Sequence, residues 1–188
     1  LGLLNLYGLA GGVFFLCMFV LHGAIWLSIK SEGDLQTRAL AAATFVWPIM
    51  LALLVVFLIL TSLYTKLYDS YLTMPVLFIL PLLTLASLLG ARCMLSKGKL
   101  WLAWGCSALF ILGVTFFGVM GMFPGMIISS LDPAATVTAF NGSSSQLTLK
   151  IMLGVALVMV PVVLIYQFWM YRLFSHPVTA KDLDDHAY

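Results

Sequence analysis

One histidine stands inside a long apolar run of this sequence, where it is the side chain best suited to chemistry. His22 lies in the stretch FVLHGAIWLSIK, about one helical turn before Trp26. A neutral imidazole can ligate haem iron or a metal, contact a proton or a quinone, or hydrogen-bond to a neighbouring helix. The other histidines, His176 and His186, lie near the C-terminal end, so no bis-histidine or histidine–cysteine pair can be built within the apolar runs.

The three cysteines do not form a metal or redox motif. Cys17, Cys93 and Cys106 lie in or beside apolar stretches, with no C-x-x-C spacing and no histidine to complete a site. We predict that they are small buried hydrophobic side chains and that the chain binds no metal. A nucleophile triad, paired acids and a phosphate loop are also absent from the sequence, which assigns no catalytic residue.

The composition indicates that these residues sit in an integral membrane protein. Of 188 residues, 63% are hydrophobic and 9% are charged, and the mean hydropathy is +1.11, far from the values of soluble domains. A formal net charge of +2 without a basic run argues against a nucleic-acid partner. The first residue is Leu1 and no basic segment precedes the apolar stretch, so we expect a fragment or processed piece rather than a signal peptide.

Five apolar runs are long enough to cross a bilayer as helices of about 20 residues. Hydrocarbon cannot satisfy exposed backbone groups, and no run shows the alternation of a barrel strand. We therefore predict an all-α integral membrane protein with about five transmembrane helices in a bundle at 1–172, followed by a tail at 173–188. The spans are placed at about 3–29, 39–65, 74–94, 100–123 and 147–172, with an outer loop at about 124–146.

Lysine and arginine predict the orientation. They are concentrated in the first loop, the third loop and the tail, which five crossings put on one side, so the tail is expected to be cytoplasmic. Aromatic residues expected at the inner interface are Trp26, Trp101, Trp104, Trp169 and Tyr171, and those expected at the outer interface are Tyr64, Tyr68 and Tyr71. Lys30, Arg38, Arg92, Lys97, Lys99, Arg172 and Lys181 fall inside, and Lys66 and Lys150 fall outside.

The segment from Lys30 to Arg38 is predicted to be a solvated loop. Ser31 is expected to cap the second helix, and Arg38 is expected to reach lipid phosphate or to pair with Glu32 or Asp34.

The outer loop is long and almost uncharged. Turns are predicted at Asp132-Pro133 and at Asn141-Gly142, and Ser145 is predicted to cap the last helix.

Two stretches resemble the small core subunit, subunit II, of cytochrome bd quinol oxidases. The first, YGLAGGVFFLCMFVLHGAIWLSIKSEGDLQTRA, leads from a Gly-rich helix through a polar residue and Gly-Ala into K-x-x-G-x-L-x-x-R-A. The second, FPGMIISSLDPAATVTAFNGSSSQLTLKIMLGVALVMVPVVLIYQFWMYRLF, carries FP, SS, SSxxTL and P-x-x-x-x-Y-x-x-W-x-Y in order. The resemblance covers the second half of that subunit.

The resemblance implies a subunit of a quinol:oxygen oxidoreductase in a bacterial or archaeal cytoplasmic membrane. Two b-type haems and one d-type haem are then expected in the large partner subunit, with quinol as substrate and none of the haems bound by this chain. This chain would give structural support and access for protons or oxygen. Further expected partners are the missing N-terminal half, in the same or a separate chain, a small single-span subunit, and lipids. Relatives carry another polar residue such as Gln at the position of His22, which favours packing over ligation.

Two other functions stay open on the residues alone. Pro48 and Pro161 should kink their helices, as in a secondary transporter or channel fragment without a redox role, although kinks are also common in packed bundles. The sequence lacks a detectable inverted repeat and a membrane acid pair for ion coupling. A lone haem-binding membrane cytochrome would need a second axial ligand beside His22.

Overall fold

The computed structural model of the chain describes residues 5–129 and 132–176. These residues form two compact units, one within 1–122 and one at 123–176. Five helices among the described residues are long and apolar enough to cross a membrane, which confirms the predicted all-α membrane fold. That all five join in one bundle over 1–172 stays a prediction.

The long helices follow the apolar runs, because a helix satisfies its own backbone groups in lipid. A 3₁₀ turn, η1 (Pro75–Phe78), leads into α4, and the predicted first start at residue 3 lies outside the described residues. The helices are α1 (Leu6–Lys30), α2 (Gly33–Tyr64), α4 (Ile79–Ser96), α5 (Leu100–Met122) and α6 (Gln146–Leu173).

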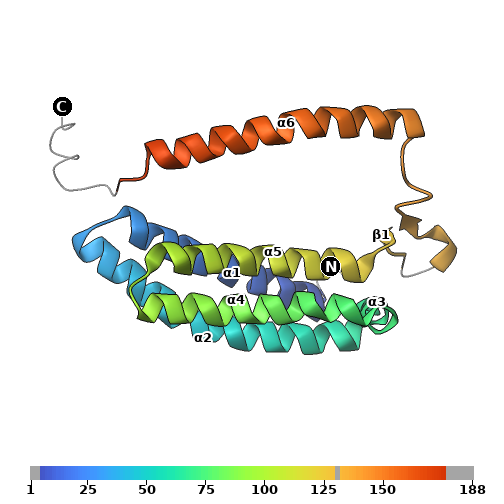
Figure 1. Ribbon diagram of the computed structural model, residues 1–188. Helices are drawn as coiled ribbons and strands as arrows, with labels where there is room; N and C mark the ends of the chain where they lie inside the picture. The colour runs from blue at the N-terminus through green and yellow to red at the C-terminus, as the bar shows by residue number, and fades with distance from the viewer. Residues whose placement is uncertain (1–4, 130–131, 177–188) are drawn as a thin grey trace. The chain divides into compact units, whose positions relative to one another are not determined.

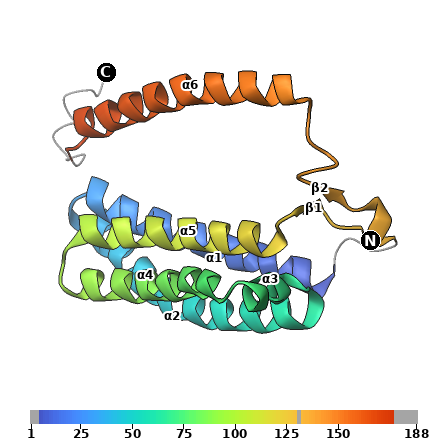
Figure 2. The same cartoon turned by 45° about the vertical axis from the view of Figure 1, so that its right-hand side comes forward.

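Two helix hairpins pack together in the first unit. α1 packs on α2 and α4 on α5, and the hairpins meet through α1 with α5 and α2 with α4; Figures 1 and 2 show the four helices side by side. The Nε1 of Trp47 donates to the carbonyl of Leu88 over 2.8 Å, which joins α2 to α4. Core residues with at most 1% exposure include Phe14, Leu21, Ile25, Met50, Leu88 and Phe110.

α4 and α5 approach closely at Gly113. A Cβ at this position would overlap the Thr84 side chain and lie 3.3 Å from the Cα of Thr84. Such close approach lets membrane helices gain van der Waals contact where no hydrophobic driving force exists between them. Glycine at 113 is therefore a packing requirement of this helix pair.

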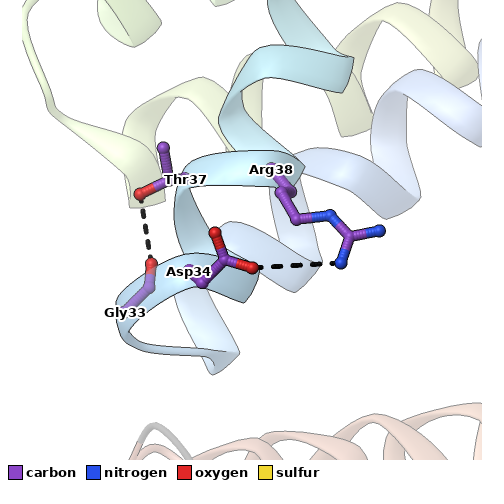
Figure 3. A network of polar contacts seen from close by, with 4 residues as sticks. All are labelled: Gly33, Asp34, Thr37 and Arg38. Carbon is purple, nitrogen blue, oxygen red and sulfur yellow. Dashed lines mark hydrogen bonds and ion pairs between the residues drawn. The ribbon is translucent and has the colours of Figure 1, made fainter.

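α2 begins at Gly33 rather than at residue 39, so part of the predicted charged loop is helical. In Figure 3, Thr37 Oγ1 donates to the Gly33 carbonyl over 3.1 Å, and Arg38 lies 3.9 Å from Asp34. The second contact confirms a predicted pairing of Arg38. A carboxylate in the first turn also complements the positive end of the helix dipole.

The predicted capping role of Ser31 is wrong. Glu32 occupies the position before α2 and makes no side-chain cap bond. Ser31 Oγ instead donates to the carbonyl of Leu27 over 2.7 Å, at the end of α1. Gln36 Nε2 donates to the carbonyl of Ser28 over 2.9 Å and ties the start of α2 to α1.

A short helix, α3 (Leu67–Thr73), lies where the sequence predicts only a loop between spans. It packs on α5. Tyr71 is fully buried, and its hydroxyl donates to the Phe117 carbonyl over 2.7 Å. Ser70 Oγ donates to the Gly121 carbonyl over 3.0 Å. α3 is therefore tied to α5 at this end of the unit by one buried and one partly buried hydrogen bond.

The second unit consists of a small hairpin and α6. Strand β1 (Gly125–Ile127) pairs antiparallel with β2 (Val137–Thr138), with a 3₁₀ turn η2 (Pro133–Ala135) between them. Asp132 Oδ1 accepts from the Ala134 N–H over 2.9 Å, and Ser145 Oγ accepts from the Thr148 N–H over 3.3 Å. The second bond confirms Ser145 as the cap of the last helix. None of the residues of α6 is buried.

Candidate functional site

His22 is joined to α5 by a side-chain hydrogen bond. Its Nδ1 lies 2.8 Å from Ser107 Oγ, and its ring lies 5.5 Å from the Trp104 ring between centroids. The Ser107 hydroxyl donates to the Trp104 carbonyl over 2.8 Å. Because a hydroxyl has one proton, Nδ1–H of the imidazole then donates to Ser107 Oγ and Nε2 carries the lone pair. His22 thus has the contacts of a residue that packs α1 against α5.

Aromatic rings and one lysine surround the end of α1 next to His22. Trp26 lies 5.3 Å from Trp104 and 5.9 Å from Trp101 between ring centroids. The Lys30 Nζ lies 5.1 Å from the centroid of Trp26 and 5.8 Å from that of Trp101. We call Trp26, Trp101, Trp104 and Lys30 the tryptophan cluster. Trp26, Trp101 and Trp104, three of the four tryptophans predicted at the inner interface, therefore share one end of the helices.

The described residues around His22 do not form a metal-ion centre. No group of three or more His, Cys, Asp or Glu side chains among the described residues is placed to hold a metal ion. Ser107 Oγ contacts Nδ1 of the imidazole, and the Trp104 ring lies beside the imidazole ring. His176 lies in the second unit, and His186 lies outside the described residues.

An apolar cavity of about 600 Å³ lies within the first unit, apart from His22. Its few polar groups include Tyr7 and Thr61, whose hydroxyl oxygens lie 3.2 Å apart. No charged residue is among its lining residues. The cavity can hold an apolar molecule or chain segment, but its walls supply no acid, base or nucleophile. Lining side chains include Phe14, Leu54, Phe57, Thr84, Val114 and Phe117.

The prediction for the cysteines is wrong in part. Cys93 is exposed, whereas Cys17 and Cys106 are partly buried. Cys106 Sγ lies 3.3 Å from the position of a Cβ on Gly90, so it fills space between α4 and α5. All three are free thiols.

Sequence reasoning missed the partners of the singled-out residues. Ser107 stands 85 positions from His22, and Phe117 stands 46 from Tyr71. A serine inside the apolar run of α5 was the available signal for the first pair. The second pair had no signal, because its acceptor is a backbone carbonyl. Tyr71, expected at the outer interface, is fully buried.

The comparison with protein families shows to which family this chain belongs. Residues 1–174 match the family described as cytochrome bd terminal oxidase subunit II. The chain belongs to the cytochrome bd oxidase subunit II family. Membership confirms the resemblance of the two quoted stretches and favours an oxidase subunit over a transporter or channel fragment.

Curated members of the subunit II family are similar along nearly the whole chain. "Cytochrome bd ubiquinol oxidase subunit 2" of Bacillus subtilis is 27% identical over 183 residues, covering 95% of this chain and 52% of that protein. "Cytochrome bd-I ubiquinol oxidase subunit 2" of Escherichia coli K12 is 28% identical over 213 residues, covering 97% of this chain and 55% of that protein. The chain thus spans about half the length of these curated relatives.

Proposed function

We propose that this chain is part of the membrane-embedded subunit II of a cytochrome bd-type quinol:oxygen oxidoreductase of the aerobic or microaerobic respiratory chain. The match of residues 1–174 to the subunit II family carries the proposal. Its five apolar helices suit a multi-pass subunit of such a complex. The redox reaction is the oxidation of quinol coupled to the reduction of oxygen to water.

The role of the chain is structural support of a haem-bearing large subunit. His22, the only histidine of the four long helices in the first unit, bonds through Nδ1 to Ser107 on α5 and packs beside the Trp104 ring. The two b-type haems and the d-type haem belong to the large subunit in this proposal. His22 then fixes α1 on α5 and ligates no iron.

A carboxylate route for protons through these spans has no support in the residues. Among the described acids, Glu32, Asp69 and Asp132 lie outside the long helices, and Asp34 lies in the first turn of α2. The apolar cavity of about 600 Å³ is compatible with passage of an apolar gas such as oxygen.

The partners and location follow from the same proposal. They are the large subunit, the remaining half of subunit II in the same or a separate chain, a small single-span subunit, quinol and lipids. The complex lies in the cytoplasmic membrane with the C-terminus of this chain on the cytoplasmic side. The concentration of cations at the α1–α2 and α4–α5 turns supports this orientation.

Affinity purification of the complex through a tag on this chain tests the proposal. We expect reduced-minus-oxidised spectra with b-type bands and a chlorin-type d band, together with oxygen consumption that depends on quinol. A pure, folded preparation without haem and without quinol oxidase activity would contradict the proposal. Uptake of a substrate by liposomes containing only that preparation would then support a transporter.

A further inference from the structure

Basic residues outnumber acidic residues at one end of the first unit. Among residues 5–122, this end, where α1 meets α2 and α4 meets α5, has five cations and two acids, Glu32 and Asp34, whereas the α3 end has Lys66 and Asp69. Asp34 is already 3.9 Å from Arg38. Within residues 5–122, cations therefore outnumber acids where the four apolar helices end. The cations are Lys30, Arg38, Arg92, Lys97 and Lys99.

Lys30 is held in place by aromatic rings. Its Nζ lies 5.1 Å from the Trp26 centroid and 5.8 Å from the Trp101 centroid, close enough for cation–π attraction to both. Tryptophan side chains favour the headgroup level of a bilayer, because the ring is apolar and its N–H is polar. The two indoles thus fix the Lys30 ammonium at the level of lipid phosphates.

The α4–α5 turn, which directly precedes Trp101 in the chain, carries two more lysines. Gly98 has a φ of +68°, and the Lys99 N–H donates to the Met94 carbonyl over 3.0 Å, which defines a tight turn. Lys97 and Lys99 flank Gly98 and are exposed. Lys99 precedes Trp101 by two positions, so the α4–α5 turn with its lysines lies at the same end of the helices as Lys30.

We propose that Lys30, Lys97 and Lys99, with Trp26 and Trp101, bind the phosphodiester headgroup of an anionic phospholipid such as phosphatidylglycerol. Lysine ammonium groups act as compact point charges toward phosphate oxygens. Basic pockets between membrane helices on the cytoplasmic side are suited to such headgroups. Leu27 and Leu102, which are 42% and 55% exposed, offer apolar surface to the acyl chains below. We call Lys30, Lys97, Lys99, Trp26 and Trp101 the lipid site.

Photo-crosslinking of the purified complex in nanodiscs tests the lipid site. The probes are phosphatidylglycerol and phosphatidylcholine with the same diazirine group in the acyl chain, and labelled peptides are mapped by mass spectrometry. We expect phosphatidylglycerol to label peptides from the ends of α1 and α5 more strongly. Attraction to an anionic surface predicts a loss of about fivefold in apparent affinity for each lysine changed to glutamine.

Matched variants separate the lipid site from general electrostatics. Lys30→Gln with Lys97→Gln and Lys99→Gln should abolish the preference for phosphatidylglycerol, whereas Lys30→Arg should retain it. Lys66→Gln with Lys150→Gln removes two cations elsewhere and should leave labelling unchanged. The exposed pair Lys97→Gln and Lys99→Gln serves as a second test if the triple variant does not fold.

Three results would overturn the proposal. They are equal labelling by both lipids, equal loss in the Lys66 and Lys150 variant, and full displacement of the lipid probe by inorganic phosphate at the same concentration. The last would indicate a site for a soluble anion. Labelling does not require haem or quinol oxidase activity, so its outcome is separate from that of the proposed function.

Discussion

The two ends of the four-helix unit hold their helices together in different ways. At the α3 end, Tyr71 is fully buried and donates to Phe117, and Ser70 donates to Gly121. At the opposite end, Trp101 is 50% exposed and stands beside the Lys30 ammonium. The α3 end is therefore closed by contacts within the chain, whereas the tryptophan cluster presents aromatic and charged groups to its surroundings. The stability of the unit should therefore depend mainly on the α3 end, and lipid binding on the end that carries the tryptophan cluster.

Truncation of one buried and one exposed aromatic ring gives the largest expected contrast. Tyr71→Ala removes a ring packed 5.1 Å from Phe117 and 5.6 Å from Phe78, and should lower the free energy of unfolding by about 3–5 kcal/mol. Trp101→Ala should lower it by about 1 kcal/mol, because half of the ring is already exposed. Reversible unfolding in mixed detergent micelles measures both. An equal or larger loss for Trp101→Ala would refute the contrast between the ends.

Substitution of Gly113, where α5 contacts Thr84 of α4, tests whether tight packing continues between the two ends. Gly113→Ala forces Thr84 and its helix away and should cost about 1–3 kcal/mol. Gly105→Ala lies on the same helix with nothing within 4 Å of the added Cβ. It should be neutral or stabilising by up to about 1 kcal/mol. The same unfolding assay compares the two variants, and equal effects would mean that α4 and α5 are not tightly packed at Gly113.

The α3 end should also make the stability of the unit depend on pH, because Tyr71 titrates there. Burial and the neighbouring Tyr68 raise the pKa of Tyr71 to about 12 from its usual 10.0. The folded chain therefore holds this proton more tightly than the unfolded chain does. Its contribution is fully present below pH 10 and is lost as pH rises through about 12.

Tyr71→Phe isolates that contribution. The variant removes the hydroxyl, should cost about 1 kcal/mol at neutral pH, and should lose the Tyr71-dependent part of the fall in stability between pH 10 and about 12. Thermal unfolding across this pH range measures the effect. If stability still falls to the same extent over this pH range in the variant, Tyr71 is not the cause of the fall.

The smallest effect is expected at the bond between α1 and α5. Ser107→Ala removes the partner of His22 and should cost at most about 1 kcal/mol, since the imidazole is partly exposed and can find another partner. Unfolding of the variant is compared with that of Ser87→Ala, whose hydroxyl bonds only locally to the Thr84 carbonyl. A loss above about 3 kcal/mol would assign His22 and Ser107 a larger part in the core.

The long helices could be predicted because their apolar runs leave one physical solution in lipid. The start of α2 was missed, since Glu32 and Asp34 resemble a solvated loop although an acid is favourable in a first turn. α3 was missed because a helix of seven residues gives too short a pattern. β1 and β2 are shorter still, and they lie within the predicted outer loop.

The sequence predicts which residues belong to the candidate site, but it does not predict how they contact one another. The sequence shows that His22 is the only histidine in its apolar run, and it predicts that Trp26, Trp101 and Trp104 lie at the same end of their helices. It does not show which side chains meet across helices. Ser107 and the placement of Lys30 over two rings depend on how α1 rotates against α5, which no local pattern encodes.

The haem content of the purified complex with His22→Gln tests the central claim most directly. Glutamine can still hydrogen-bond to Ser107 but does not serve as a haem ligand, and Ser107→Ala provides the matched control for the lost contact. The account predicts that the ratio of haem to protein and the b-type and d-type bands equal those of the unchanged complex. Loss of one haem in His22→Gln, with full haem content in Ser107→Ala, would contradict it and make His22 an axial ligand.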